Sequence, residues 1–232
     1  MTLTTISKEE FTSFANTVSH RSFIQSVEMA DLLEKRGNTV QFIAWKQEDQ
    51  VQVAAILYSL PMTGGLHMEI NSGPLYQEED MLEPFYAALK DYAKENGAIE
   101  LVIKPYDTYQ TFDSDGNPTS EKQTHFMDTL KKLGYQHDGL TTGYPGGEGD
   151  WHYVKDMEGI TEKNLLKSFS KKGKPLVKKA KSFGIELKRL NRDELQLFKD
   201  ITSSTSDRRD YQDKTLDYYQ TFYDSFGDNA DF

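Results

Sequence analysis

Helical and strand-like segments alternate along this chain in an order that begins again near residue 150. Two helices come first, at residues 7–16 and 26–35, because their apolar residues recur at helical spacing. Three strands are predicted next from β-branched and aromatic runs, at residues 40–45, 51–58 and 67–70. A helix at 79–96, a strand at 99–103 and a helix at 126–133 follow. This alternation predicts a mixed α/β fold rather than an all-helical or all-β one.

The second half of the chain repeats the pattern after a glycine-rich connection at residues 139–149. A strand is predicted at Trp151–Val154, and helices at 162–172 and 176–182 are separated by a break at Gly173–Pro175. The remaining predicted elements are a strand and two helices, at residues 185–190, 192–203 and 214–225. We therefore expect two units, at residues 1–149 and 150–232, the second of them incomplete.

A lysine-rich segment lies between Leu165 and Gly184 in a chain whose formal net charge is −10. It holds seven lysines and no acidic residue, and Leu176, Ala180 and Phe183 form an apolar stripe at helical spacing. One interpretation is a core helix with a solvated lysine face. Uncompensated lysines repel one another, however, so the segment also suits phosphate groups of a nucleic acid or nucleotide.

A second group of polar residues, TSDRRDYQDKTLDYY, follows at residues 205–219. Arg208 and Arg209 offer guanidinium groups that grip phosphate oxygens, while Lys214 precedes Tyr218 by one helical turn. This set can hold a phosphorylated ligand. The alternative is a helix end with surface ion pairs completed by neighbouring aspartates.

Several classes of protein are excluded or disfavoured by what the sequence lacks. It has no cysteine, which excludes disulfides and thiolate chemistry and fits a cytoplasmic location. It has no apolar run long enough to span a membrane and no GxSxG, GxxxxGK[ST], GxGxxG or HExxH motif. Its five histidines have no ligand spacing, so we expect no metal.

Both polar segments resemble the Fem family of peptidoglycan branch-forming aminoacyltransferases, which includes FemX, MurM and MurN. In the first half, FIQSVEMADLLEKRG is similar to the family's glutamine-led early helix, INSGPLY to its Gly-Pro after a strand, and IKPYDTYQTF to its following proline segment. The resemblance covers essentially the whole chain and is greatest to MurN-like members. The family's second unit continues further, so the resemblance implies a C-terminally truncated fragment, liable to be inactive alone.

The resemblance implies a GNAT-like (acyl-CoA N-acyltransferase) fold, with one complete unit and an incomplete second unit. It also implies transfer of alanine, serine or glycine from aminoacyl-tRNA to the lysine branch of a lipid-linked or UDP-linked muramyl pentapeptide. No cofactor and no DNA partner are expected, and contact with the inner face of the membrane would come through the substrate. Two alternatives stay open: a non-catalytic module that binds phosphate or nucleic acid, and an acetyl-CoA-dependent N-acetyltransferase.

Residue roles carry over unevenly from the family. Its diphosphate clamp joins a lysine on the early helix to an arginine four residues before a tyrosine, and Lys214 and Tyr218 have this spacing. Lys35 and Arg36 lie close to the early-helix position, and Arg208 and Arg209 are further candidates for the precursor. The expected tRNA contacts are Lys171, Lys172, Lys178 and Lys179. An aspartate that some members carry is Lys104 here, with Asp107 nearby, and no catalytic residue is assigned.

Overall fold

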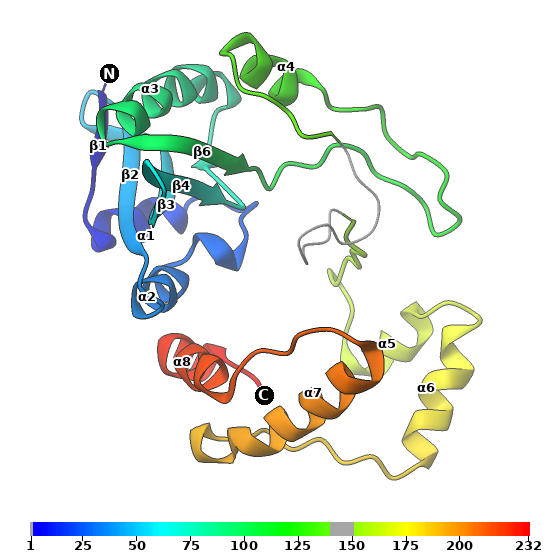
Figure 1. Ribbon diagram of the computed structural model, residues 1–232. Helices are drawn as coiled ribbons and strands as arrows, with labels where there is room; N and C mark the ends of the chain where they lie inside the picture. The colour runs from blue at the N-terminus through cyan, green and yellow to red at the C-terminus, as the bar shows by residue number, and fades with distance from the viewer. Residues whose placement is uncertain (1, 140–150) are drawn as a thin grey trace. The chain divides into compact units, whose positions relative to one another are not determined.

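The computed structural model describes residues 2–139 and 151–232, which form two compact units (Figure 1). Unit 1 comprises Met1–His137 together with Asn191–Phe232, and unit 2 comprises Asp138–Leu190. Unit 2 is therefore inserted between two stretches of unit 1. These compact units have different bounds from the expected units 1–149 and 150–232, whose assignment as repeats of one fold stays a prediction.

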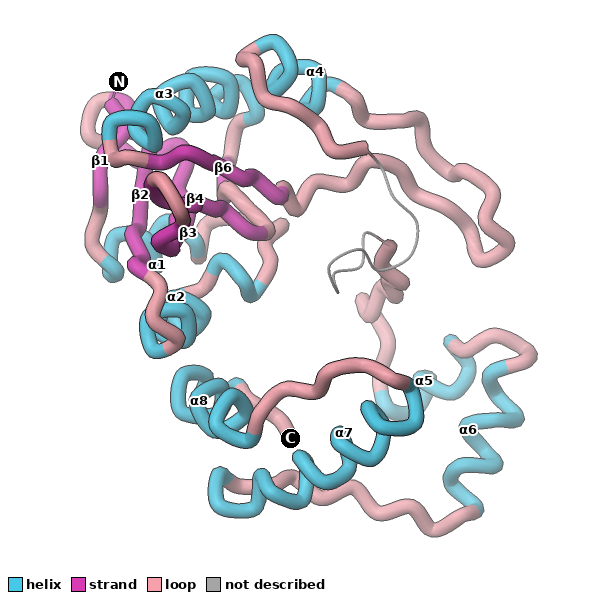
Figure 2. The backbone as a smooth tube through the Cα atoms, viewed as in Figure 1, coloured by secondary structure: helices cyan, strands magenta, loops and turns pink. Residues whose placement is uncertain are grey.

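Unit 1 is built on a six-stranded sheet in the order β1-β2-β3-β4-β6, with β5 paired to β3. Strands β4 and β6 are parallel, and the other paired strands are antiparallel. The six strands of this sheet, drawn in magenta in Figure 2, are Thr2–Thr5, Thr39–Gln47, Gln50–Met62, Gly65–Asn71, Leu75–Tyr76 and Ala98–Lys104. The mixed α/β fold is thus confirmed, although the short strands β1 and β5 were not predicted.

Helices cover both faces of this sheet because its central strand is apolar on both sides. Along β3, Val53, Ala55 and Leu57 are buried in one cluster with α3 (Leu82–Glu95), which α4 (His125–Lys132) extends. The alternate residues Ala54 and Ile56 pack on α1 (Lys8–Ala15) and α2 (Val27–Lys35). This two-residue alternation is the geometry of a strand that is buried on both faces.

The predicted helices of unit 1 are confirmed, and serine side chains cap the first turns of α1 and α2. The Ser7 hydroxyl accepts a hydrogen bond from the Glu10 N–H at 3.1 Å, and the Ser26 hydroxyl accepts one from the Met29 N–H at 3.2 Å. The last helices are α7 (Leu195–Arg209) and α8 (Leu216–Phe226). Short 3₁₀ turns η1, η2, η4 and η5 lie at Phe23–Gln25, Glu79–Met81, Arg192–Glu194 and Gly227–Asn229.

The described part of unit 2 holds two helices, α5 (Glu162–Ser168) and α6 (Gly173–Ser182). The strands predicted at 151–154 and 185–190 are wrong, because both segments are irregular and, among the residues that the structure describes, pair with no strand. Their composition favours a strand, but backbone groups need a neighbouring strand to bond with. The predicted break at Gly173–Pro175 is instead the first turn of α6. The backbone N–H groups of a first turn have no partner within the helix, so a proline there costs no hydrogen bond.

The apolar stripe of α6 does not enter a core. Leu176 and Phe183 are 67% and 66% exposed, so the interpretation of this segment as a core helix is wrong. In the described residues, none of the helices combines the length and the apolar content that a membrane span requires.

Candidate functional site

Helix α8 lies beside α2, although the two are far apart in the sequence (Figure 1). Met29 and Leu32 of α2 are buried together with Phe226 of α8 and with Ala230, which follows η5. Lys35 adds a hydrogen bond from its ammonium to the Ser225 hydroxyl at 3.0 Å. This packing fixes α2 against the last turn of α8.

Two cations meet at one tyrosine where these helices touch. The Arg36 guanidinium carbon and the Lys214 ammonium each lie 5.4 Å from the centroid of the Tyr218 ring. Such contacts are attractive, but two cations near one ring also repel each other. In the described residues neither forms an ion pair with a carboxylate, so an anionic ligand would relieve that repulsion.

The structure thus brings together three of the six residues that were predicted to bind the precursor, Arg36, Lys214 and Tyr218, while Lys35 bonds to Ser225 in the last turn of α8. The other two, Arg208 and Arg209, are exposed in the last turn of α7, where cations suit the negative helix end. Within the described chain no contact joins them to Tyr218. Their role in binding stays a prediction.

Asp213 holds the segment that carries Lys214, although the sequence alone suggested only a surface ion pair for the aspartates of this segment. Its side chain is only 8% exposed and accepts hydrogen bonds from the Lys199 ammonium at 2.6 Å and the Tyr219 hydroxyl at 2.7 Å. It also accepts one from the backbone N–H of Lys214 at 2.8 Å. Asp213 therefore ties the segment before α8 to α7, two residues before the N-cap Thr215.

We expect Asp213→Asn to lower stability at neutral pH but not in strong acid. The hydrogen bond from Lys199 and those from Tyr219, Thr202 and the Lys214 backbone outweigh burial and hold the pKa of Asp213 far below its usual value. A depressed folded-state pKa contributes stability above the unfolded pKa of about 3.9, and this contribution is lost as the pH falls through the folded pKa. Thermal unfolding from pH 7 to pH 2 should show the melting-point difference from wild type shrinking below about pH 4. A constant difference would contradict this role.

Lys104 forms an ion pair across the parallel strands β4 and β6. Its ammonium lies 2.9 Å from Glu69 Oε1, and His67 Nε2 lies 3.1 Å from Glu69 Oε2. Burial disfavours the charged carboxylate, but the hydrogen bonds from Lys104 and Tyr58 outweigh it and lower the pKa of Glu69. Asp107 instead accepts a hydrogen bond from the Tyr76 hydroxyl.

The glutamine and the glycine that carried the resemblance in the first half touch each other. Gln25 is 2% exposed, donates to the backbone oxygen of Asn71 at 2.7 Å and accepts from the N–H of Ile56 at 2.8 Å. A Cβ on Gly73 would lie 2.8 Å from Gln25 Cδ, closer than atoms can pack. Gln25 therefore holds β3 and the end of β4, and Gly73 leaves room for it.

The four lysines predicted to bind tRNA lie on unit 2. Lys178 and Lys179 are on α6, and Lys171 and Lys172 are in the turn that precedes it. All four are exposed, and within the described part of the chain none forms an ion pair. A positively charged surface without compensating acids is what a phosphate backbone requires, so the RNA assignment stays a prediction that the exposure favours.

No metal site is evident in residues 2–139 and 151–232, where no group of three or more histidine, aspartate and glutamate side chains could hold an ion.

The functional contacts that the sequence did not predict are those between residues that are distant in the chain. The contact of Arg36 with Tyr218 and the bonds of Asp213 to α7 have no local periodic signal.

Known proteins resemble this chain over nearly its whole length. Aminoacyltransferase FemB of Staphylococcus epidermidis is 32% identical over 235 residues, which cover 99% of this chain and 56% of that protein. Aminoacyltransferase FemA of Staphylococcus aureus is 26% identical over 225 residues, or 94% of this chain and 54% of FemA. The chain thus spans about half the length of these curated relatives.

The crystal structure of FemX has the same fold over this region. It matches with a TM-score of 0.73 at 21% identity, covering 97% of this chain and 55% of FemX. The finer resemblance to MurN-like proteins stays a prediction. A model of the FemAB family matches residues 6–232. This chain therefore belongs to the FemAB family.

Proposed function

We propose that this chain takes part in the tRNA-dependent addition of an amino acid of the alanine, serine or glycine class to the lysine branch of a peptidoglycan precursor. The observation that carries the proposal is the pair of uncompensated cations at Tyr218, in a chain whose relatives are named aminoacyltransferases. The diphosphate of a lipid-linked or UDP-linked muramyl pentapeptide would lie between Arg36 and Lys214. The resulting charge-assisted hydrogen bonds are stronger than neutral ones.

The reaction joins an amine to an activated ester. The amine nitrogen bonds to the aminoacyl carbonyl carbon, the bond from that carbon to the tRNA ribose oxygen breaks, and the proton lost by the amine passes to the departing oxygen. A lysine amine titrates near ~10.4, so it must be deprotonated before it attacks. Positive dipoles must also meet the oxyanion that forms. Neither requirement calls for a metal or an organic cofactor.

The two polyanions of this reaction would occupy different units of the chain. The precursor diphosphate suits the cluster of Lys35, Arg36, Lys214 and Tyr218 in unit 1, with Arg208 and Arg209 as outer contacts. The tRNA suits the exposed lysines of unit 2. We further propose that the fold is GNAT-like, a reading that the similarity to FemX supports. Binding of a lipid-linked precursor would bring the protein to the inner face of the membrane from the cytoplasm.

Replacing Lys214 by alanine should weaken precursor binding by about 1.5–3 kcal/mol, or about 10- to 150-fold, because one charged hydrogen bond to phosphate is lost. The measurement is fluorescence anisotropy of a labelled UDP-linked, lysine-containing muramyl pentapeptide. Lys94→Ala, which removes an exposed lysine at the end of α3, is the matched control and should bind like wild type. An unchanged dissociation constant for Lys214→Ala would remove this residue from the site.

A further inference from the structure

Lys214 lies outside both of the helices that surround it. It belongs to the connection at residues 210–215, between the end of α7 and the start of α8. A lysine side chain is a flexible four-carbon stem, so its ammonium can occupy many positions. To stay 5.4 Å from the centroid of the Tyr218 ring, this ammonium needs a backbone that is itself fixed in place.

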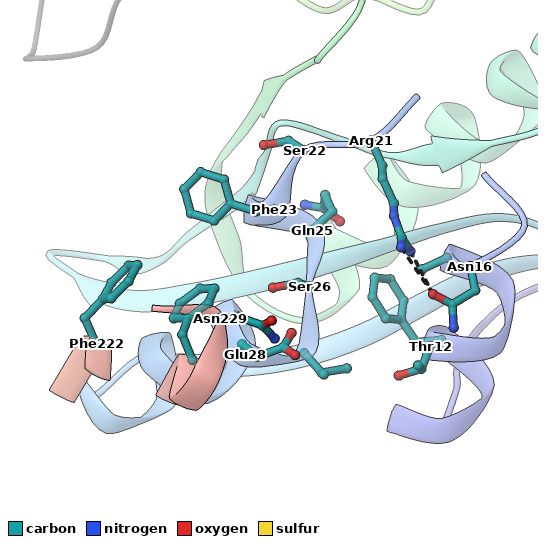
Figure 3. A pocket seen from close by; sticks show the side chains of 14 residues that line it. Thr12, Asn16, Arg21, Ser22, Phe23, Gln25, Ser26, Glu28, Phe222 and Asn229 are labelled. Carbon is teal, nitrogen blue, oxygen red and sulfur yellow. Dashed lines mark hydrogen bonds between the residues drawn. The ribbon is translucent and has the colours of Figure 1, made fainter. Parts of the chain in front are cut away.

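The packing of α8 on α2 is too distant to fix that backbone. It buries Phe226 in the last turn of α8, which lies about 15 Å from the first residue of the helix at a rise of about 1.5 Å per residue. A pocket of about 470 Å³ opens beside this contact, and Figure 3 shows Phe23 and Phe222 on one side of it and Arg21 on the other. The start of α8 therefore depends on other contacts.

The carboxylate of Asp213 supplies such contacts, with one oxygen for each side of the connection. Oδ2 accepts hydrogen bonds from the Lys199 ammonium at 2.6 Å and the Thr202 hydroxyl at 2.8 Å, both on α7. Oδ1 accepts hydrogen bonds from the Lys214 backbone N–H at 2.8 Å and the Tyr219 hydroxyl at 2.7 Å. Because the Asp213 side chain is only 8% exposed, these bonds are stronger than they would be in water.

The residues held in this way flank Tyr218. Lys214 precedes it by one helical turn, and Tyr219 follows it directly. The backbone N–H of Tyr218 donates to the hydroxyl of the N-cap Thr215 at 3.1 Å, which fixes the first turn of α8. Asp213 thereby sets the backbone of Lys214 relative to the turn that carries the Tyr218 ring.

We propose that Asp213 is a positioning residue that raises the affinity of the Lys214 and Tyr218 site for the diphosphate of the acceptor. The proposal rests on the proposed function, which puts the diphosphate there. Both oxygens of Asp213 are already bonded to protein donors, so the carboxylate acts through Lys214 rather than by contact with the ligand.

The sign of the effect separates positioning from simple charge. A carboxylate one residue from Lys214 repels an anionic ligand, so its charge alone weakens binding. If Asp213 acted only as a charge, neutralising it would strengthen binding of the diphosphate. If it places the ammonium, neutralising it weakens binding.

The test is fluorescence anisotropy of the labelled UDP-linked, lysine-containing muramyl pentapeptide with the full 232-residue chain. It is run at pH 7 and at a temperature where circular dichroism shows every variant folded. Asp213→Asn should weaken binding by about 3- to 30-fold, within the range of coupling between contacting residues. Its new amide would meet the Lys199 ammonium as a second donor, so the bond to α7 is lost.

Tyr219→Phe tests the same positioning in a variant that keeps the charge of Asp213 and the aromatic ring. It loses only the hydrogen bond to Asp213 Oδ1 and should weaken binding by about 2- to 5-fold. Asp224→Asn is the matched control, because it removes the same charge from α8 and breaks an ion pair to Arg192 of 2.6 Å. It lies ten residues after Lys214 and should leave the dissociation constant unchanged.

A double-mutant cycle gives a readout that a general loss of stability would not produce. In a Lys214→Ala background the ammonium that Asp213 places is absent, so Asp213→Asn should weaken binding by less than about 2-fold further. A full further loss in this background would show that Asp213 does not act through Lys214. That result would overturn the positioning role.

The remaining outcomes separate this proposal from the proposed function. If Lys214→Ala weakens binding while Asp213→Asn and Tyr219→Phe do not, the positioning role fails and the diphosphate site stands. Tighter binding by Asp213→Asn would show that the carboxylate acts only by its charge, and equal weakening by Asp224→Asn would show an effect of α8 as a whole. Either would overturn the positioning role. Unchanged binding by Lys214→Ala would overturn both proposals.

Discussion

Gln25→Ala should destabilise unit 1 by about 2–5 kcal/mol, a large share of the stability of a domain. The substitution leaves the buried Ile56 N–H and the half-buried Asn71 oxygen without the Gln25 side chain as a partner, and it also opens a cavity. Each unsatisfied buried group costs about 1–3 kcal/mol. Urea unfolding followed by far-UV circular dichroism measures this loss.

The chain offers a matched control for this experiment in Gln77. This exposed glutamine also makes one side-chain hydrogen bond, from its amide to the Thr17 hydroxyl at 2.7 Å. Because water can replace that bond, Gln77→Ala should change stability by less than about 0.5 kcal/mol. Equal effects of the two alanine variants would show that the buried bonds of Gln25 contribute no more than a surface contact.

Replacing Lys171, Lys172, Lys178 and Lys179 together by glutamine should weaken tRNA binding by about 100-fold or more at low salt. Each lysine that neutralises a phosphate releases counterions and adds about 0.7–0.9 to the slope of log affinity against log salt. The slope of the variant should therefore be shallower by about 3. Filter binding of tRNA from 50 to 300 mM salt measures both quantities.

The measurement must distinguish the loss of these four lysines from the accompanying change in the net charge of the chain. A control with Lys90, Lys94, Lys122 and Lys131 changed to glutamine removes the same charge from unit 1. It should keep a slope close to that of wild type. If both variants lose the same slope, the lysines of α6 are a solvated face and the RNA site lies elsewhere.

Periodic patterns of apolar residues predicted most elements of unit 1. In a long strand such as β3 the pattern recurs at every second residue, and in a long helix such as α3 at every third or fourth residue. Strands β1 and β5, with four and two residues, are too short to show such a pattern. At 185–190 the apolar composition indicated a strand, yet Leu187 is 99% exposed and no strand pairs with it. Composition can favour a strand, but only tertiary structure supplies its neighbour.

The candidate site also consists of one part that local spacing predicts and another that only the tertiary structure creates. Lys214 and Tyr218 were found because they lie one turn apart on a single helix, a spacing that the sequence displays directly. The contact of Arg36 with Tyr218 and the pocket beside Phe23 depend on α8 lying against α2. Such an arrangement is decided by the burial of Met29, Leu32 and Phe226 in one cluster, which no local spacing encodes.

The insertion of unit 2 between two stretches of unit 1 has a consequence for the order of events during synthesis. The sheet of unit 1 is complete in sequence by Lys104, whereas α8 begins at Leu216. A ribosome adds about 5–20 residues per second, so Met29 and Leu32 stay uncovered for several seconds after the sheet can form. Closing the loop between the two helices also carries an entropic cost. The nascent chain should therefore acquire its sheet first and the contacts of Arg36 and Lys214 with Tyr218 last.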